Sequence, residues 1–550
     1  MTNPLAILVA FSVVGCSADS VASQHPAFEC PDGAINRTYE YRWQAFRRHC
    51  VKTPEGWVVT EFLPKVGWAG KYNTIVCPAG HHLREARWMH DGTIAADYAR
   101  FWFGTNGVHR SKYCTWLGSA ILDVVRVTGD EKLAVGLLDS IVGLFESWET
   151  NTVVCKTLPR GEPFPVGGDG KGMFTCTDDR EGCELTLSGD GYRPLFNSAM
   201  YGEAKAIAEM ARLANRPDLA ARFSHKASAM ERNIREKLWN SDVEFFTAMA
   251  TNCIRSNVRE LHGYAPWYFG MSLPDKASAW RQLLDENGFA APFGLCFAER
   301  RASGFRIEYS GHPCQWNGPS WPFATSIALT GLAHALADNA AGSVGKDSFV
   351  HLLGQYAAQQ IRKTEDGRTI PWVDENLDPF TGEWIARKIL MDRGCKGERG
   401  EDYNHSTFAD LVIAGLCGVH PHLDGVLELR PLIPEGWEYL KLQNVKVRGH
   451  MVSIYWDRFG SRYGKGAGFS VYADGRTVYW SNAPQRCHVL YDNAMQPVAR
   501  RGIDANENIG YNALRKVGRG LCEAGKYRFQ SIEATGAPWS NSSRTGCAKP

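Results

Sequence analysis

Hydrophobic positions between about residues 87 and 419 recur with a helical period. Within 131–148, apolar residues return at intervals of three and four, which places them on one stripe of a helix. Downstream segments repeat this spacing, and residues such as Pro217 separate one segment from the next. The pattern predicts helices over residues 111–128, 131–148, 197–213, 218–239, 275–286, 321–337, 346–362 and 406–419.

After residue 420 the pattern changes to strict alternation of apolar and polar residues. Such alternation is typical of strands with one buried face, and Asp474-Gly475 is a favourable hairpin turn. It predicts strands within residues 427–432, 445–447, 452–456, 469–472 and 477–480. Short strands of this kind indicate a small β-sandwich.

These two patterns divide the chain into regions. Many helices in succession favour an α/α toroid over a four-helix bundle. We therefore expect a mainly α fold, with the toroid over 87–420 and the C-terminal β-sandwich over 421–530. Residues 24–86 form an N-terminal extension, and 531–550, rich in Ser, Thr and Gly, form a tail.

The first residues have the pattern of an export signal. The apolar run from Pro4 to Cys16 is shorter than a membrane span and is followed by small residues, which predicts a signal peptide over 1–23 and secretion. An alternative is a bacterial lipoprotein anchored through Cys16, because Val13-Val14-Gly15-Cys16 resembles a lipobox. No later segment is long and apolar enough to predict a transmembrane helix.

Composition narrows the function further. Lys and Arg number 61 against 59 Asp and Glu, without a basic stripe, so we expect no nucleic-acid partner. The 16 Cys favour an oxidising compartment, and the 18 Trp suit stacking against sugar rings. Because His81-His82-x-x-Glu85 is not a standard ligand spacing, we expect no metal, and no other cofactor motif is present.

Loops rich in carboxylates, Trp and amides are the candidates for chemistry, since long loops in helical domains are usually functional. They cover residues 176–184, 316–322, 372–383 and 399–406. Cys176 and Cys183 flank the first of these loops, so we predict a disulfide between them that holds Asp178 and Asp179. Cys417, within an apolar stretch, is predicted to be a buried free thiol.

Two of these loops carry a family resemblance. The segments WNGPSWPF (316–323) and DENLDPFTGEW (374–384) resemble motifs of the inverting α-glycosidases of glycoside hydrolase family 63, the trehalases and the mannosylglycerate hydrolases. The segment YRPLFNSAMYGEAKAIAEMA (192–211) is also similar, and Asp378 is an extra residue in the second motif. The resemblance implies an (α/α)6 barrel, a carbohydrate substrate, and Glu375 as the general base that activates water.

The general acid is less clearly marked in this resemblance, which implies an Asp in a short Gly-x-Asp motif before the helix that contains Asn197. Asp178 and Asp179 are the favoured pair, and Asp190 is the alternative. Glu383 is an alternative for the base.

The chemistry independently requires two carboxyl groups. Inverting hydrolysis needs an acid on the departing oxygen and a carboxylate that activates water, about 6.5–9.5 Å apart. The acid must stay protonated near neutral pH, which burial or a neighbouring like charge achieves.

Substrate-binding residues are expected among aromatic and hydrogen-bonding side chains near these motifs. Asn404 and His405 stand where the last helix begins, and Asn404, which lies in an Asn-x-Ser sequon, is alternatively an N-cap. The predicted binding residues are Arg87, Trp88, Asp91, Arg193, Trp316, Asn317, Trp321, Asn404 and His405.

The sequence thus predicts a secreted inverting glycoside hydrolase. Two other functions stay open: a non-catalytic carbohydrate-binding protein on the same barrel, and a polysaccharide lyase, which would use Tyr or His in place of paired carboxylates.

Overall fold

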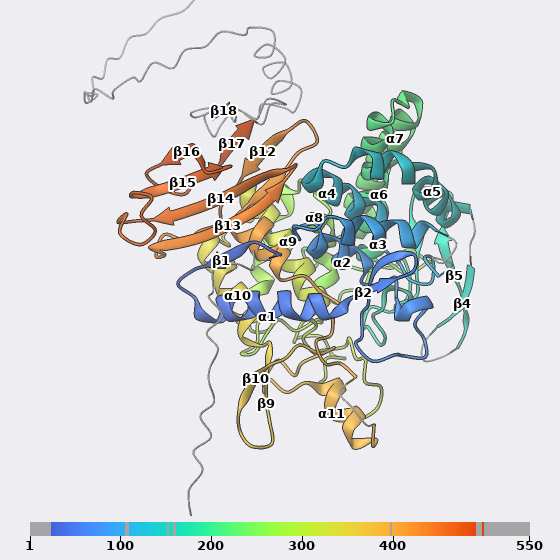
Figure 1. The fold of residues 1–550 in the computed structure, drawn as a ribbon. Coiled ribbons are helices and arrows are strands. Elements are labelled where there is room, and N and C mark those ends of the chain that lie inside the picture. The colour runs from blue at the N-terminus through green and yellow to red at the C-terminus, as the bar shows by residue number, and fades with distance from the viewer. Residues whose placement is uncertain are drawn as a thin grey trace, which may run out of the picture. The chain divides into compact units, whose positions relative to one another are not determined.

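Helices dominate the chain up to residue 416, and strands dominate after it (Figure 1). The computed structural model describes residues 24–104, 109–150, 153–157, 161–395, 399–490 and 498–499. The predicted signal peptide, the lipobox with Cys16 and the tail over 531–550 lie outside the described residues. In the described part of the chain, no helix is long and apolar enough to cross a membrane.

Two kinds of helical segment are present. The α-helices are α1 (Gly33–His49), α2 (Ala79–Ala86), α3 (Thr93–Phe103), α4 (Leu117–Thr128), α5 (Glu131–Thr150), α6 (Pro194–Leu213), α7 (Pro217–Asn233), α8 (Ala265–Tyr268), α9 (Pro322–Ala337), α10 (Lys346–Ala358) and α11 (Ile385–Asp392). The 3-10 or π segments are η1 (Lys71–Asn73), η2 (Asp179–Glu181), η3 (Ile234–Leu238), η4 (Leu261–Tyr264), η5 (Pro274–Leu283) and η6 (Leu411–Leu416).

The helices with clear boundary residues match the sequence prediction. A proline at the first turn begins α6, α7 and α9, where its missing N–H has no partner to lose. Gly129, with φ of 76°, ends α4 in the left-handed conformation. The predicted helix over 111–128 is shorter than expected and begins only at Leu117.

Other predicted helices differ in type or extent. The segment over 275–286 is the 3-10 helix η5, and that over 406–419 is the π-helical η6. The segment over 218–239 turns into the π-helical η3 after α7, and α10 ends at Ala358. Helix α2 was not predicted because it has only eight residues, half of them polar or charged, and it is nevertheless buried throughout.

Helices that alternate along the chain pack against one another. Contacts connect α2 to α4, α4 to α6, α6 to α8, α8 to α9, and α9 to η6. The first member of this row, α2, is joined to the last, η6. Glu85 of α2 accepts the backbone N–H groups of Ala409 and Asp410, just before η6, both at 3.1 Å. Arg87 adds an ion pair of 2.6 Å to Asp410. This closed row agrees with a helical toroid.

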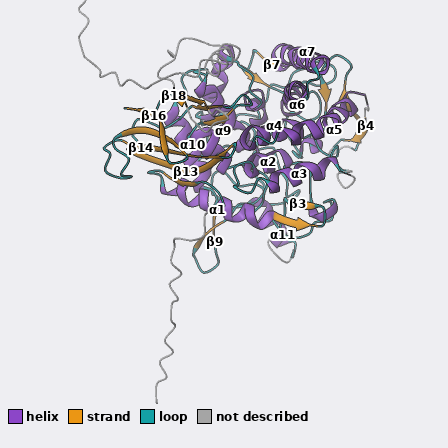
Figure 2. Ribbon diagram, turned by 45° about the horizontal axis from the view of Figure 1, so that its top comes forward, coloured by secondary structure: helices purple, strands orange, loops and turns teal. Residues whose placement is uncertain are grey.

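Two antiparallel sheets form the C-terminal β region, whose long strands gather together in Figure 2. The first has the order β1 (Ala27–Glu29), β13 (Tyr439–Val447), β14 (His450–Asp457), β15 (Gly468–Ala473) and β16 (Arg476–Ser481). The second has the order β11 (Val419–Pro421), β12 (Val426–Leu429), β17 (Cys487–Leu490) and β18 (Val498–Ala499).

The strand predictions hold in this region. Each predicted run overlaps a strand, and Asp474 and Gly475 connect β15 to β16 with φ angles of 48° and 77°. An unexpected feature is β1, from the N-terminal extension, which adds an edge strand with Phe28 opposite Leu442.

The helical part also contains small antiparallel sheets of two or three short strands. These are β2 (Cys50–Thr53) with β3 (Gly56–Val59), β4 (Val153–Lys156) with β5 (Pro163–Gly168) and β6 (Phe174–Thr175), β7 (Trp239–Asn240) with β8 (Phe245–Phe246), and β9 (Ile361–Lys363) with β10 (Thr369–Pro371).

Candidate active site

A cavity of about 250 Å³ brings together residues from distant loops of the helical part. Three carboxyl groups, two thiols, one guanidinium and several aromatic rings share it, a mixture that suits the hydroxyls and apolar faces of a sugar. Its lining consists of Glu61, Phe62, Trp68, Ile75, Cys77, Tyr113, Gly182, Glu184, His312, Pro313, Cys314, Trp321, Glu375, Arg399, Tyr403 and His405.

Glu375, the predicted base, lies in this cavity on the loop that follows β10. Its carboxylate accepts a hydrogen bond from Arg399 and another from the Cys314 thiol at 3.1 Å. Its backbone N–H donates to Asp374 Oδ1 at 2.8 Å, so the neighbouring carboxyl faces the main chain. These contacts give Glu375 one orientation, with a positive charge beside it.

The two loops that carry the family resemblance are held together by main-chain bonds. Ser320 and Leu377 exchange two backbone hydrogen bonds of 2.9 Å. The Asn376 side chain donates to Pro313 O at 2.9 Å. This pairing places Trp321 and Glu375 in the lining of one cavity.

Glu184 is a second carboxyl group of the cavity, on the loop between β6 and α6. Burial, assisted by the charge of Glu375, raises the pKa of Glu184 to about 7. Among the described residues, no other side chain hydrogen-bonds its carboxyl group. The group is therefore about half protonated near pH 7, and it lines the cavity where a ligand would bind.

Glu61, just after β3, is the third carboxyl group and is 4% exposed. Its Oε1 accepts a hydrogen bond of 2.8 Å from the Tyr403 hydroxyl and lies 3.4 Å from His405 Nε2. Burial raises the pKa of Glu61 to about 8, and the charges of Glu375 and Glu184 act in the same direction. Sequence analysis missed Glu61 because no motif surrounds it.

The predicted acids Asp178 and Asp179, and the alternative Asp190, do not line this cavity. Asp178 Oδ2 accepts hydrogen bonds from the Thr186 N–H at 3.0 Å and the Thr186 hydroxyl at 3.1 Å. Asp190 Oδ1 accepts the Asp178 N–H at 2.9 Å. These bonds shape the loop that carries Glu184.

Only part of the predicted binding set reaches the cavity. Trp321 and His405 line it, whereas Trp316 lies behind Trp321, with the two rings stacked at 3.8 Å. Asn317, beside Trp316, is buried outside the lining. Glu383, the alternative base, is exposed and pairs with Lys388 at 3.3 Å.

Four other predicted binding residues do not line the cavity, and their side chains are bonded to other residues of the protein. Arg87 and Trp88 both donate to Asp410, the Trp88 indole at 2.7 Å. Asp91 accepts the N–H of Thr93 at 3.0 Å at the start of α3. Arg193 is buried in an ion pair with Glu181. These side chains do form hydrogen bonds and ion pairs, but their partners are other residues of the protein. The contacts therefore join structural elements.

Asn404 is also buried, next to the cavity wall. Its side chain donates to Thr60 O at 3.1 Å and its backbone N–H donates to Glu61 O at 3.0 Å. It therefore positions Glu61 and does not cap a helix.

We expect Asn404 to carry no glycan when the protein is made in a glycosylating host. Its amide nitrogen is buried and already donates a hydrogen bond, so an acceptor site there is closed in the folded chain. Glycopeptide mass spectrometry is the measurement, and the sequon at Asn541 is an internal comparison. A glycan on Asn404 in folded protein would contradict this placement.

The predicted disulfide between Cys176 and Cys183 does not form, and both are free thiols. The 3-10 turn η2 lies between them, and Cys176 Sγ instead lies 3.1 Å from Cys114 Sγ. Cys183 Sγ lies 3.6 Å from His262 Nδ1. The loop is thus held by backbone bonds and buried polar contacts. Cys417 is a buried free thiol, as predicted.

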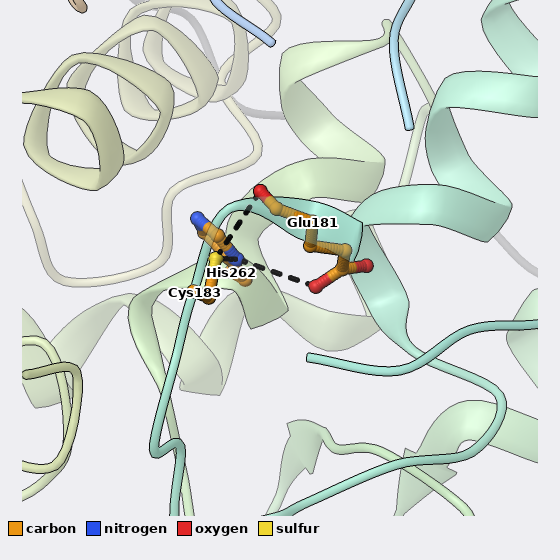
Figure 3. A group of neighbouring side chains, drawn as sticks. All are labelled: Glu181, Cys183 and His262. Atoms are coloured by element: carbon orange, nitrogen blue, oxygen red, sulfur yellow. Dashed lines mark hydrogen bonds and ion pairs between the residues drawn. The ribbon is translucent and has the colours of Figure 1, made fainter. Parts of the chain in front are cut away.

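Glu181, Cys183 and His262 form a buried cluster (Figure 3), with ligand-type atoms within 4.8 Å of one another. Gly182, between the first two, lines the cavity. Both Glu181 oxygens are already used, by Arg193 Nε at 2.7 Å and by the Phe196 N–H at 2.9 Å. Burial raises the pKa of the Cys183 thiol, which keeps it protonated. This donor set does not suit a metal ion; it anchors the loop of Glu184 to α6.

Glu181→Gln is expected to lower the free energy of unfolding by roughly 3 kcal/mol, since it removes the nearer carboxylate of the buried Arg193, at 2.7 Å, and leaves only Glu260, at 3.9 Å. Burial alone would raise the pKa of Glu181, but Arg193 and His262 lower it to about 2. The stabilisation is therefore present above about pH 4.3, the unfolded pKa, and decreases as pH falls toward 2.

Urea unfolding of Glu181→Gln and wild type at pH 7 and pH 3 measures this difference. The control is Asp139→Asn, which removes the exposed ion pair with Arg216 and is expected to change stability little. A difference between Glu181→Gln and wild type that does not shrink at pH 3 would contradict the assignment.

Comparison with known proteins agrees with the cavity chemistry. Residues 71–406 match the family model described as Mannosylglycerate hydrolase MGH1-like glycoside hydrolase domain. Residues 422–479 match the glycosyl hydrolase family 65 C-terminal domain. The first match includes Glu184 and Glu375, and the second covers much of the β region.

Among solved structures, one named a sialidase is 33% identical, with a TM-score of 0.75, over 84% of this chain and 41% of that one. The chain thus spans about two fifths of the length of that protein. The GH63 mannosylglycerate hydrolase from Thermus thermophilus in complex with glucose is 12% identical, with a TM-score of 0.49, over 68% of this chain and 99% of that one.

Proposed function

The chain belongs to the family of Mannosylglycerate hydrolase MGH1-like glycoside hydrolase domains, and on this premise we propose that it is a glycosidase acting with inversion at the cavity just described. Glu184 is the general acid and Glu375 the general base. The observation that carries this proposal is that both carboxyl groups line one cavity in different environments. Glu375 stands beside a guanidinium, and Glu184 is half-buried and has no cation paired with it among the described residues.

The acid role falls on Glu184 because its environment keeps a proton on it. With a pKa raised to about 7, it can protonate a departing glycosidic oxygen near neutral pH. Asp178 and Asp179 precede it on the same loop, but the cavity lining does not include them. The sequence prediction for that pair stays a prediction, which the variants described in the Discussion test.

The base role falls on Glu375 because it is oriented and paired with a cation. Arg399 and the Cys314 thiol hold its oxygens in place, and Arg399 stabilises negative charge there. A water molecule between Glu375 and the anomeric carbon would lose its proton to this carboxylate as the bond to the leaving group breaks. One product is the released sugar, and the other is the alcohol whose oxygen Glu184 protonates.

Two further points accompany this proposal. The row α2, α4, α6, α8, α9 and η6 is the inner ring of an (α/α)6 toroid, which its closure through Glu85 supports. The protein is exported to the cell exterior, which the apolar run over residues 4–16 supports.

The test is a screen of glycosides and oligosaccharides with NMR detection of the first-formed anomer. Inversion predicts that the released sugar first appears with the anomeric configuration opposite to that of the substrate. Retention would overturn the mechanism, binding without turnover would indicate a carbohydrate-binding protein, and an unsaturated product would indicate a lyase.

A further inference from the structure

Two of the residues that line the cavity are exposed, and they mark the place where it opens to solvent. They are Trp68, which is 44% exposed, and His312. The proposed base Glu375 is only 2% exposed, whereas the proposed acid Glu184 is half-buried. The acid therefore lies on the more open side of the cavity.

Trp68 lies on the loop between β3 and η1, and this loop is firmly held. Lys112 donates a hydrogen bond of 2.7 Å to the Trp68 carbonyl, and the Asn73 side chain donates to Phe62 O at 2.9 Å. The Trp68 ring meets the Phe62 ring edge to face at 5.7 Å, and the Arg399 guanidinium lies 5.5 Å from its centroid. A ring held in this way loses little conformational entropy when a ligand packs on it. Trp68 is thus a preformed flat surface at the opening.

The size of the cavity limits how much of a substrate it encloses. Its volume of about 250 Å³ is below the range of about 300–1,000 Å³ that is typical of pockets for drug-sized ligands, so it suits one sugar ring. The rest of a glycoside must project through the opening. Because the acid protonates the departing oxygen and Glu184 lies on the open side, the projecting part is the leaving group.

We propose that Trp68 stacks against the leaving group of the substrate, and that this leaving group is a second sugar ring. The apolar face of a sugar ring packs on an indole ring, while its hydroxyls stay in water at the opening. The inference rests on the proposed function for the positions of the acid and of the bond that breaks. Trp68 is then a residue that determines specificity and takes no part in bond cleavage.

This surface comes from outside the part of the chain that matches the glycoside hydrolase family model. The matched residues begin at 71, so Trp68 and Phe62 precede them, whereas Glu184 and Glu375 lie within them. The N-terminal extension therefore supplies the site for the leaving group, and the matched domain supplies the acid and the base.

The first test compares leaving groups on one sugar, using the disaccharide, the methyl glycoside and the glycosyl fluoride of the sugar that the screen identifies. Trp68→Ala should lower kcat/KM on the disaccharide by roughly 10- to 100-fold, mainly by raising KM, as is usual for the loss of one aromatic anchor. Trp68→Phe should lose less, because a smaller flat face remains. On the methyl glycoside and the fluoride, whose leaving groups are too small to cover the ring, kcat/KM should change by less than about twofold.

A second test measures binding without turnover, by isothermal titration calorimetry on the full chain carrying Glu375→Gln. The probes are maltose, cellobiose, mannobiose and lactose, with the methyl glycosides of glucose, mannose and galactose. Adding Trp68→Ala should weaken binding of the best disaccharide by the same factor and leave its methyl glycoside within about twofold. The matched control is Trp480→Ala, since this tryptophan of β16 is 54% exposed but does not line the cavity. It should leave kinetics and binding unchanged.

The outcomes separate this inference from the proposed function. Equal losses on the disaccharide and the fluoride, no loss on the disaccharide, or a loss confined to aryl glycosides would overturn the inference while the glycosidase proposal stands. If disaccharides bind through Trp68 but none is hydrolysed, the glycosidase proposal fails and the second sugar site stands. If no disaccharide is bound or hydrolysed, both fail.

Discussion

Glu375→Gln is expected to lower kcat by about 100- to 10,000-fold on the best substrate from the screen, while the protein stays folded. The amide has nearly the shape of the carboxylate and keeps one oxygen, which can accept from Arg399, while its NH2 group replaces the oxygen that accepts from the Cys314 thiol. It cannot take a proton from water. The measurement is steady-state kinetics, with the melting temperature as a check on folding. KM should change much less than kcat.

Glu383→Gln is the matched control, because this exposed glutamate eight residues later is the alternative base in the sequence. It is expected to keep near wild-type kcat. Asp374→Asn should have an intermediate effect, since Asp374 orients the Glu375 main chain. If Glu375→Gln keeps more than about a tenth of wild-type kcat, its role as the base is wrong.

Glu184→Gln is expected to act selectively, according to the leaving group. On oligosaccharides or alkyl glycosides, whose departing oxygen needs a proton, kcat should fall by at least about 100-fold. A glycosyl fluoride of the same sugar releases a fluoride ion, which needs no proton to depart. On this substrate kcat should fall by less than about tenfold. A residue with a purely structural role would reduce both rates equally.

The dependence of the wild-type rate on pH tests the acid role of Glu184 independently. The acid works only while protonated, and the pKa of Glu184 is raised to about 7. On alkyl glycosides the rate should therefore fall as pH rises through about 7, and this decline should be absent for the fluoride. Asp178→Asn is the comparison: if that variant, and not Glu184→Gln, shows the leaving-group effect, the sequence prediction for the acid is right.

The regular elements were largely predictable, because their patterns depend on neighbours in the chain. Helix α5 follows from apolar periodicity, α6 from periodicity together with Pro194 at its first turn, and α9 from an apolar run that begins at Pro322. Strands β13 to β16 follow from alternation. Helix α2 was not predictable in this way, because it spans only eight residues and its polar and charged side chains are buried by tertiary contacts that no local pattern records.

The candidate site was predictable only where a local motif carries it. Glu375 was found because it stands in a recognisable segment, and Trp321 because it stands in another. Glu184 lies in the acidic loop that the sequence singled out, yet the sequence favoured Asp178 and Asp179 there and did not select Glu184. Which of the three reaches the cavity depends on the turn η2 and on the bonds of Thr186 to Asp178.

By itself, the sequence predicted α4 to α7, α9, α10 and strands β12 to β16, but not α1 to α3, α8 or α11. It also predicted the candidate base and the chemistry of paired carboxyl groups, since these depend on residue types and short spacings. Only the tertiary structure decided that Arg87, Trp88 and Arg193 join structural elements, and that Glu61 belongs to the cavity. Glu61 and Glu375 are more than 300 residues apart in the chain. Their proximity arises from packing and from Asn404, which bonds to the Glu61 main chain, and contacts over such distances leave no local pattern in the sequence.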